Sequence, residues 1–351
     1  MYFRKMNIFK FILFPFSCLY WLITSIRNRL FEFNILEQYK SNISIISFGN
    51  LNMGGTGKTP HVAFVIEKLS HNNVAVISRG YRRKNKNLIE ADSTHHSYED
   101  IGDEPMELLQ NFEGENFKMI VEGNRKKALQ YLEKQTYNTD LVLLDDGYQH
   151  RYVTRDLNIL LTDFNCPFYN DFILPYGTLR ESKYEAKRAD VILVTKCPNS
   201  ITEEKKNEFK KRIKRYSSAD VYFTSIKYYK AINQENKKVT LNSDKKLLLI
   251  TGIANPKHIY QYLDKLNITY TTIKYQDHYN FSTNDMENIL WKSKNFDGII
   301  PTEKDWMRLR EKKHELINST EIIRLQIGVQ FIDLEQEKKF TTKIKNLLSK
   351  K

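Results

Sequence analysis

The residues with the clearest chemical signature lie in a glycine-rich loop at positions 49–60. This loop contains the run Gly54-Gly55-Thr56-Gly57-Lys58-Thr59. Glycines let consecutive backbone N–H groups converge on phosphate oxygens, a lysine reaches the β- and γ-phosphates, and a threonine hydroxyl can bind Mg²⁺. The loop therefore predicts a nucleotide site. Its expected phosphate-binding residues are Asn52, Met53, Gly54, Gly55, Thr56, Gly57, Lys58 and Thr59.

The segments on either side of the loop predict a strand before it and a helix after it. Residues 43–48 form a short apolar run rich in β-branched side chains, which is typical of a parallel strand buried on both faces. Apolar residues then recur at helical spacing, at Val62, Val65, Ile66 and Leu69. This context favours a phosphate loop over a plain glycine turn. One departure is Asn52, which stands where the usual G-x-x-x-x-G-K-[ST] pattern has its first glycine.

Two carboxylates follow a second expected strand. Residues 141–144 are all apolar and lead directly into Asp145 and Asp146. An aspartate at the end of a strand helps to hold Mg²⁺ in phosphate-loop enzymes, although such a residue on its own is often a turn residue. Because the phosphate loop precedes this strand in the chain, we interpret the pair as part of a magnesium site.

Alternation of apolar runs and helical stretches predicts an α/β fold. Further strands are expected at residues 74–78, 118–121, 157–162 and 191–195. The pattern is that of a P-loop NTPase-like, mainly parallel sheet with helices on both faces and a site at the carboxyl ends of its strands. Expected strands at 247–251, 269–274, 298–301 and 322–327 indicate a smaller C-terminal α/β domain.

The N-terminal segment predicts a membrane-associated helix. Basic residues flank an uncharged stretch over 11–26, namely Arg4, Lys5 and Lys10 before it and Arg27 and Arg29 after it. The first alanine of the chain is Ala63, so a signal-peptide cleavage site is missing. The stretch is also shorter than the roughly 20 apolar residues that span a bilayer. A monotopic helix in one leaflet fits best, and an ordinary helix covering the core is the alternative.

Composition limits the classes of partner. The 351 residues include 55 Lys+Arg against 42 Asp+Glu, a net charge of +13, and 41% hydrophobic residues. This apolar content excludes a disordered chain, whereas the charge is compatible with nucleic acid, an anionic membrane or a phosphorylated substrate. Cys18, Cys166 and Cys197 are scattered, which argues against a disulfide framework or a structural zinc site.

With these residues in place, the chain resembles the tetraacyldisaccharide 4′-kinases, the lipid A 4′-kinase family. The family's motifs occur in the family's order: Gly-Asn-Leu-Asn-Met-Gly-Gly-Thr-Gly-Lys-Thr-Pro at 49–60, Ser-Arg-Gly-Tyr-Arg at 78–82, Gly-Asp-Glu-Pro at 102–105, Asp-Asp-Gly-Tyr-Gln-His at 145–150, Pro-Tyr-Gly-Thr-Leu-Arg-Glu at 175–181, Asp-His-Tyr-Asn-Phe at 277–281 and Thr-Glu-Lys-Asp at 302–305. The resemblance implies transfer of the ATP γ-phosphoryl group to the 4′-hydroxyl of an acylated disaccharide 1-phosphate, which forms lipid IVA in lipid A biosynthesis.

The resemblance also implies residue roles. By similarity, Asp103 is the base that takes the proton of the acceptor hydroxyl, paired with His278, and Lys58 stabilises the transferring phosphoryl group. The implied magnesium ligands are Thr59, Asp145 and Glu104, with Asp146 as a partner outside them. From the residues alone, Asp103 equally indicates a capped helix N-terminus, and a lone histidine is more often a surface residue than a catalyst.

The residue patterns and the family resemblance together predict how the chain is organised. It comprises an N-terminal hydrophobic membrane-anchor helix over 1–31, a P-loop kinase domain over 32–222, a two-stranded linker over 223–243 and a smaller α/β domain over 244–351. We expect ATP as co-substrate, Mg²⁺, the lipid disaccharide and a membrane surface as partners, and a monomer at the inner membrane whose catalytic body faces the cytoplasm.

Other functions remain open on the sequence. A membrane-associated P-loop ATPase switch would leave residues 277–281 and 302–305 without a role, and a soluble small-molecule kinase would leave residues 11–26 unexplained. Nucleic acid is not an expected partner, because the charge comes with no recognition motif. Residues 195–198 resemble a guanine-reading motif but lack its aspartate, so GTP specificity is not supported.

Overall fold

The computed structural model describes residues 9–81, 83–114, 116–136, 138–235, 237–253, 256–276, 279–309 and 320–349. These residues form two compact units. Unit 1 contains Met1–Arg79, Gly114–Ser225 and Gln330–Lys351, and unit 2 contains Gly80–Glu113 and Ile226–Val329. Strands β8 (Asp220–Ile232) and β13 (Arg324–Phe331) carry the chain from one unit to the other.

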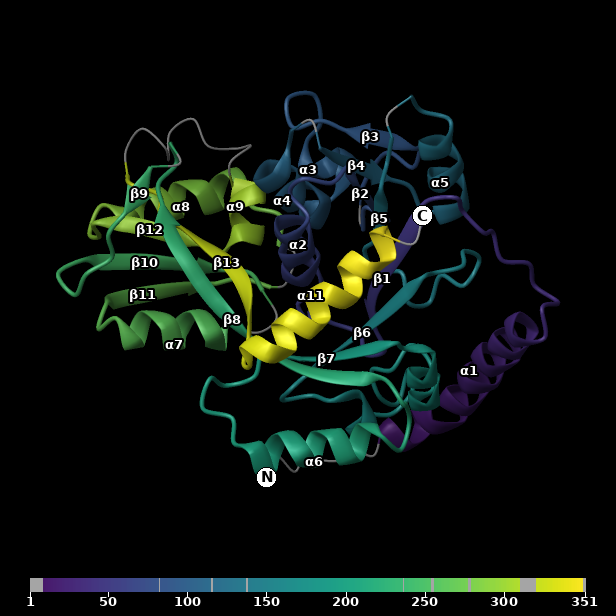
Figure 1. The fold of residues 1–351 in the computed structure, drawn as a ribbon. Helices are drawn as coiled ribbons and strands as arrows, with labels where there is room; N and C mark the ends of the chain where they lie inside the picture. The colour runs from purple at the N-terminus through teal and green to yellow at the C-terminus, as the bar shows by residue number, and fades with distance from the viewer. Residues whose placement is uncertain are drawn as a thin grey trace. The chain divides into compact units, whose positions relative to one another are not determined.

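Unit 1 is built on a parallel sheet (Figure 1). Its strand order is β8-β7-β6-β1-β5-β2-β4, with β1 at Ser44–Asn50, β2 at Val74–Ser78, β4 at Phe117–Val121, β5 at Leu141–Leu144, β6 at Leu157–Asp163 and β7 at Val191–Thr195. Neighbouring strands pair in parallel. Strands β1, β2, β5 and β7 are buried along their whole length, as expected for continuous apolar runs between covered faces. The predicted fold class is confirmed.

Helices cover this sheet through apolar stripes. They are α2 (Lys58–Lys68), α5 (Arg125–Glu133), α6 (Glu203–Ile213) and α11 (Leu334–Leu348), with short 3₁₀ turns at Phe168–Asn170 and Lys183–Arg188. Helix α1 (Phe9–Glu32) instead contacts the segments at 148–151 and 176–188. Helices α2 and α11 pack together through Phe64 and Phe340, whose ring centroids are 6.4 Å apart. Helix α6 instead buries Phe209 and Ile213 in a cluster with side chains from β6 and β7. Lys210 of the same helix lies over the ring of Phe223 in that cluster, with its Nζ 5.9 Å from the ring centroid.

Unit 2 has its own three-stranded parallel sheet, in the order β11-β10-β12 (Figure 1). The elements of the unit are β3 (Ile89–Ala91), α3 (Tyr98–Ile101), α4 (Asp103–Phe112), β9 (Lys238–Val239), β10 (Lys246–Thr251), α7 (Lys257–Lys265), β11 (Thr269–Lys274), α8 (Thr283–Ser293), β12 (Gly298–Pro301) and α9 (Glu303–Leu309). Alternate residues of β10 point to opposite faces, so Leu247 and Leu249 pack with α7, whereas Leu248 and Ile250 pack with α8.

Two strands pair in the region where the sequence predicts a two-stranded connection. Strand β9 pairs antiparallel with the end of β8, where Ala231 is opposite Val239. However, β8 already begins at Asp220 and first pairs in parallel with β7. One strand therefore serves both the large sheet and the connection. The domain boundaries expected from the sequence stay predictions.

Helix α1 carries the hydrophobic N-terminal stretch. Within the described residues, no helix has both the length and the apolar content that crossing a membrane requires. A stripe of large apolar side chains on α1 is exposed, at Ile12, Phe16, Leu19, Ile23 and Ile26. Another face carries Ser17, Asn28 and Phe31, which are buried against unit 1. Arg4 and Lys5 lie outside the described residues.

Candidate active site

The phosphate loop connects the end of β1 to the start of α2 and depends on two glycines. Gly54 has a φ of 116° and Gly57 a φ of 84°, a region that residues with a Cβ rarely adopt. Gly57 directly precedes Lys58, the first residue of α2. The N–H groups of the first helical turn have no intrahelical acceptor, and the helix dipole adds partial positive charge there. This end of α2 is therefore suited to bind phosphate.

A buried histidine holds the loop against the sheet. His61 is 4% exposed, its Nδ1 lies 2.7 Å from the Gly57 carbonyl oxygen and its Nε2 lies 3.0 Å from Thr224 Oγ1. Since a carbonyl oxygen only accepts, Nδ1 is the protonated nitrogen. Burial lowers the pKa of His61 to about 4, although its bond to Gly57 acts in the opposite direction. The ring is therefore neutral at physiological pH and fixes the last residue before α2.

Lys58 is fixed by two partners at the ends of neighbouring strands. Its Nζ donates to Asn50 Oδ1 at 3.1 Å and lies 3.4 Å from Asp146 Oδ1. Arg180 Nη1 contacts both oxygens of Asp146, at 3.0 and 2.9 Å. Burial acts to raise the pKa of Asp146, but Lys58 and Arg180 outweigh it and lower that pKa below its ordinary value. Asp146 is thus an ionised carboxylate between two cations.

The structure explains why an asparagine replaces the first glycine of the usual loop pattern. Asn52 is absent from the described residues with positive φ, so its backbone has no need of glycine. Its side chain is 5% exposed and donates to Asp171 Oδ2 at 3.0 Å. The next residue, Met53, donates its N–H to the carbonyl oxygen of Thr178 at 2.7 Å. The loop is therefore joined to the segment that precedes Arg180.

Asp145 and Thr59 supply the oxygens that a magnesium ion would need. Asp145 follows β5, Thr59 lies in the first turn of α2 after β1, and β1 and β5 are adjacent parallel strands. Both side chains are almost fully buried, at 1% and 4% exposure. Within the described ranges, no cluster of three or more His, Cys, Asp or Glu side chains is arranged around a metal position. A Mg²⁺ bound to phosphates requires only one or two protein oxygens, so the hydroxyl and carboxylate fit that ion.

Asp103 and Glu104 begin α4 in unit 2. The residue before them, Gly102, has a φ of 96°, and a Cβ on it would lie 3.2 Å from the carbonyl oxygen of Tyr81. Gly102 is the N-cap and Asp103 the first helical residue, so the expectation of a helix N-terminus was right, but Asp103 does not cap it. Helix α9 faces both acids: Arg308 Nε lies 3.3 Å from Asp103 Oδ2, and Lys304 Nζ lies 2.6 Å from Glu104 Oε1.

Arg308 is itself held in place from several sides. It is 2% exposed, and its Nη1 donates to the carbonyl oxygen of Tyr279 at 3.0 Å. Asp305, fully buried one turn earlier, lies 3.6 Å from the same nitrogen. Asp305 in turn accepts from the N–H of Gly252 at 2.8 Å and from Thr302 Oγ1. The 302–305 motif thus builds the support on which Arg308 meets Asp103.

A cavity of about 230 Å³ lies in front of Asp103 within unit 2. Its lining consists of Tyr81, Lys84, Tyr98, Glu99, Gly102, Asp103, Asn280 and Arg308. His278, the residue paired with Asp103 by resemblance, lies outside the described residues, as does Asp277. Asn280, two positions further along the chain, lines this cavity.

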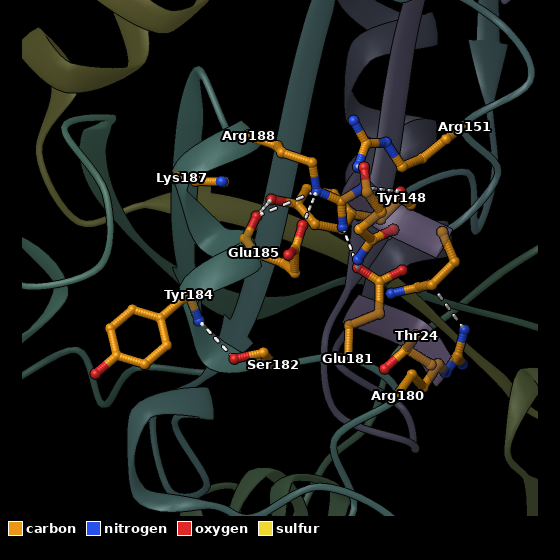
Figure 2. A network of polar contacts seen from close by, with 12 residues as sticks. Thr24, Tyr148, Arg151, Arg180, Glu181, Ser182, Tyr184, Glu185, Lys187 and Arg188 are labelled. Atoms are coloured by element: carbon orange, nitrogen blue, oxygen red, sulfur yellow. Dashed lines mark hydrogen bonds and ion pairs between the residues drawn. The ribbon is translucent and has the colours of Figure 1, made fainter. Parts of the chain in front are cut away.

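The structure thus forms two groups from the predicted site residues. Unit 1 brings together Lys58, Asp146 and the loop residues 52–59, and unit 2 brings together Asp103 and Glu104. Sequence reasoning gave no role to Asn50, Gln149, Lys304 and Arg308. Asn50 ends β1, Gln149 and Lys304 stand inside the 145–150 and 302–305 motifs, and Arg308 follows the second motif, but their partners could not be read from the sequence. Glu181, the last residue of the 175–181 motif, is buried in an ion pair with Arg188 (Figure 2).

Comparison with known proteins agrees with this geometry. The family described as Tetraacyldisaccharide-1-P 4′-kinase matches residues 9–349. A tetraacyldisaccharide 4′-kinase from Flavobacterium psychrophilum is 41% identical over 346 residues, 97% of each chain, and one from Cytophaga hutchinsonii is 36% identical over 91% of this chain and 92% of that one. A crystal structure of LpxK from Aquifex aeolicus in complex with ATP matches with a TM-score of 0.76 and 26% identity, over 97% of this chain and all of that one. The chain belongs to the tetraacyldisaccharide-1-P 4′-kinase family.

Proposed function

We propose that the chain transfers the γ-phosphoryl group of ATP to the 4′-hydroxyl of a tetraacyldisaccharide 1-phosphate through the residues described above. Membership of the family makes it a phosphotransferase of lipid A biosynthesis. The ATP complex of the Aquifex relative supports ATP as the donor. The observation that carries the residue assignment is the phosphate loop whose lysine is fixed between Asn50 and Asp146.

The phosphate loop binds and orients the triphosphate. Phosphoryl transfer requires little covalent participation by the protein, so positioning and neutralisation of charge dominate catalysis. The N–H groups at residues 54–59 and the start of α2 receive the phosphate oxygens. Lys58 then neutralises the negative charge on the transferring group, and Asp146 and Asn50 keep its ammonium aimed at that position.

Asp103 is the proposed general base. A hydroxyl must lose its proton as it attacks phosphorus, and a carboxylate within hydrogen-bond reach accepts that proton. Arg308 faces one carboxylate oxygen of Asp103, which leaves the carboxylate oriented along the cavity wall. His278 is the proposed partner of Asp103, because an imidazole can orient a carboxylate and share its proton near neutral pH.

Thr59 and Asp145 are the residues proposed to hold Mg²⁺. When bound, the ion neutralises phosphate charge and orients the triphosphate. Glu104 is the third proposed ligand, and it is paired with Lys304 in this structure. Asp146 is assigned to the outside of the ligand set, because its two oxygens already contact Arg180 and Lys58.

Membrane association through α1 completes the proposal. The exposed stripe of Ile12, Phe16, Leu19, Ile23 and Ile26 matches an apolar surface that lies in one leaflet, and an acylated substrate resides in the same phase. The chain acts as a monomer at the inner membrane with its catalytic body on the cytoplasmic side, where ATP is available.

A transfer assay tests the function directly. Radiolabelled ATP and Mg²⁺ are incubated with the protein and tetraacyldisaccharide 1-phosphate in detergent micelles, and label in the lipid is measured after extraction. We expect ATP-dependent labelling of the lipid at the 4′ position. Release of labelled phosphate with no label in the lipid would instead favour the ATPase-switch function.

A further inference from the structure

Helix α1 makes hydrogen bonds to two residues that themselves contact the phosphate loop. Tyr20 Oη donates to the carbonyl oxygen of Arg180 at 3.0 Å. Arg27 donates through Nη1 and Nη2 to the carbonyl oxygen of Gln149, at 3.4 and 3.3 Å. Each acceptor belongs to a residue that contacts a partner of Lys58. The Arg180 guanidinium binds Asp146, and the Gln149 side chain donates to Asn50.

Two series of contacts, or routes, lead from α1 to Lys58. The first passes through Arg180. Its carbonyl oxygen accepts from Tyr20, its N–H donates to the carbonyl oxygen of Leu51 in the phosphate loop at 2.7 Å, and its guanidinium binds Asp146. Asp146 in turn lies 3.4 Å from Lys58 Nζ. A displacement of the Arg180 backbone therefore changes both the loop and the carboxylate that orients Lys58.

The second route runs through Gln149. Its carbonyl oxygen accepts from Arg27, and its side-chain Nε2 donates to the carbonyl oxygen of Asn50 at 2.9 Å. The Asn50 side chain accepts from Lys58 Nζ at 3.1 Å. The two routes also contact each other, since Arg180 Nη1 donates to Gln149 Oε1 at 3.4 Å. Both routes end at the same ammonium group.

A buried ion-pair network joins the segment that follows Arg180 to α1 and to the rest of unit 1. Arg188 is 9% exposed and pairs with Glu181 and, at 3.0 Å, with Glu185 (Figure 2). Asn28 of α1 donates to the same Glu181 at 3.4 Å and accepts at its carbonyl oxygen from Arg151 at 2.9 Å. The segment thus lies between α1 and the sheet, with polar contacts to each.

We propose that Tyr20 and Arg27 are positioning residues of the nucleotide site. They fix the position of the Lys58 ammonium through Arg180 and Gln149. The inference rests on the proposed nucleotide site. It assigns α1 a task in ATP binding that is separate from any contact of its exposed stripe with a membrane. A helix that served only as an anchor would need no hydrogen bonds to the two residues that support Lys58.

Conservative variants separate positioning from simple docking of the helix. Tyr20→Phe keeps the ring and removes one donor, and Arg27→Gln removes the bidentate donor. Ser17→Ala is the matched control, because Ser17 Oγ also anchors α1, by accepting from the N–H of Tyr176 at 2.9 Å, but touches neither route. All variants are made in the full chain. MgATP affinity is measured by titration calorimetry in detergent micelles that contain no lipid acceptor.

We expect Tyr20→Phe and Arg27→Gln each to weaken MgATP binding about 3- to 10-fold, the usual effect of losing one hydrogen bond. Arg27→Lys should recover part of the loss. In the transfer assay, KM for ATP should rise while KM for the lipid stays unchanged. Ser17→Ala should bind MgATP as the wild type does, even if it melts slightly earlier, as the Tyr20 and Arg27 variants do.

Two outcomes would overturn the inference, and they are distinguishable. If the wild type binds MgATP and the Tyr20 and Arg27 variants match it, or if Ser17→Ala weakens binding as much as they do, α1 has only a docking role. If the wild type itself fails to bind MgATP, the proposed nucleotide site fails and the inference fails with it. A misfolded Arg27→Gln leaves Tyr20→Phe as the decisive variant, because it preserves the packing of the ring.

Discussion

Two consecutive aspartates at the end of β5 have different environments. Asp145 is almost fully buried, and its carbonyl oxygen accepts from Arg125 Nη2 at 3.1 Å. Asp146 has a φ of 52°, a left-handed conformation that aspartate tolerates better than most residues. This left-handed backbone conformation places its carboxylate next to Lys58 and Arg180. These different environments support the different roles that we propose for two identical side chains, Asp145 as a metal ligand and Asp146 as support for the lysine.

Asp103→Asn tests the proposed base at the same scale. The amide keeps the size of the side chain but cannot accept the proton, so we expect turnover to fall about 10²- to 10⁴-fold, the usual contribution of general-base catalysis. MgATP affinity should stay within about twofold, because the phosphate loop is intact. His278→Ala should act in the same direction. Asp264→Asn, which changes an acid on α7 that contacts Tyr270, is the control. Wild-type turnover in Asp103→Asn would remove Asp103 from the mechanism.

At the scale of elements, the phosphate loop depends on contacts between α2 and β8. His61 spans the two, since it contacts Gly57 before α2 and Thr224 on β8. Because burial lowers its folded-state pKa to about 4, the unfolded chain binds a proton at His61 over a range of pH in which the folded protein does not. The stability that His61 contributes is therefore complete above about pH 6.5 and is lost as the pH falls towards 4.

His61→Asn should reduce this acid sensitivity. Asparagine can donate to the Gly57 carbonyl oxygen but does not titrate. We expect the free energy of unfolding of the wild type to fall by about 2 kcal/mol more than that of the variant between pH 7 and pH 5. Urea unfolding at both pH values measures the difference. His71→Asn, at an exposed position, should behave as the wild type does. Parallel pH profiles for wild type and His61→Asn would contradict the account.

The ion pair between Lys304 of α9 and Glu104 of α4 gives a second prediction at the scale of elements. Burial acts to lower the pKa of Lys304, but the Glu104 carboxylate beside it outweighs burial and raises that pKa. Both side chains are about a quarter to a third exposed, at 27% and 32%, so we expect a coupling energy of only about 1 kcal/mol. A double-mutant cycle of Lys304→Met and Glu104→Gln, read by urea unfolding, measures it. Additive single variants would show that the pair contributes no coupling.

For the whole molecule, α1 has two surfaces for which we propose separate tasks. Its polar face contacts the segments at 148–151 and 176–188, whereas its apolar stripe has nothing against it among the described residues. Leu19, Ile23 and Ile26 are 50–57% exposed, an arrangement that is unfavourable in water. The proposed membrane surface would cover this stripe without disturbing the polar face.

Replacing Leu19, Ile23 and Ile26 by glutamine should release the protein from membranes. We expect at least 10-fold weaker co-sedimentation with vesicles that contain phosphatidylglycerol, because three apolar side chains no longer enter the lipid. MgATP affinity and melting temperature should stay at wild-type values. Tyr20→Phe should show the reverse pattern, with normal vesicle binding and weaker MgATP binding. Undiminished vesicle binding of the triple variant would place the membrane contact elsewhere.

Much of the fold followed from local patterns. The strands expected at 74–78, 191–195, 269–274 and 298–301 have the same bounds in the structure. Continuous apolar runs give this signal because parallel strands are buried on both faces. The start of β8 was harder to place, because this strand pairs first with β7 and then with β9, and its burial pattern changes along its length.

The sequence by itself determined the phosphate loop, the strand–loop–helix context around it and the strand-end acids, because each depends on residues that are close together in the chain. Only the tertiary structure decided which side chains support Lys58 and Asp103. Arg180, Gln149 and Arg308 act through partners that are distant in the chain, and burial and strand order bring those partners together. The same holds for α1: its apolar stripe is visible in the sequence, but its hydrogen bonds to Arg180 and Gln149 exist only once the helix packs on the folded sheet.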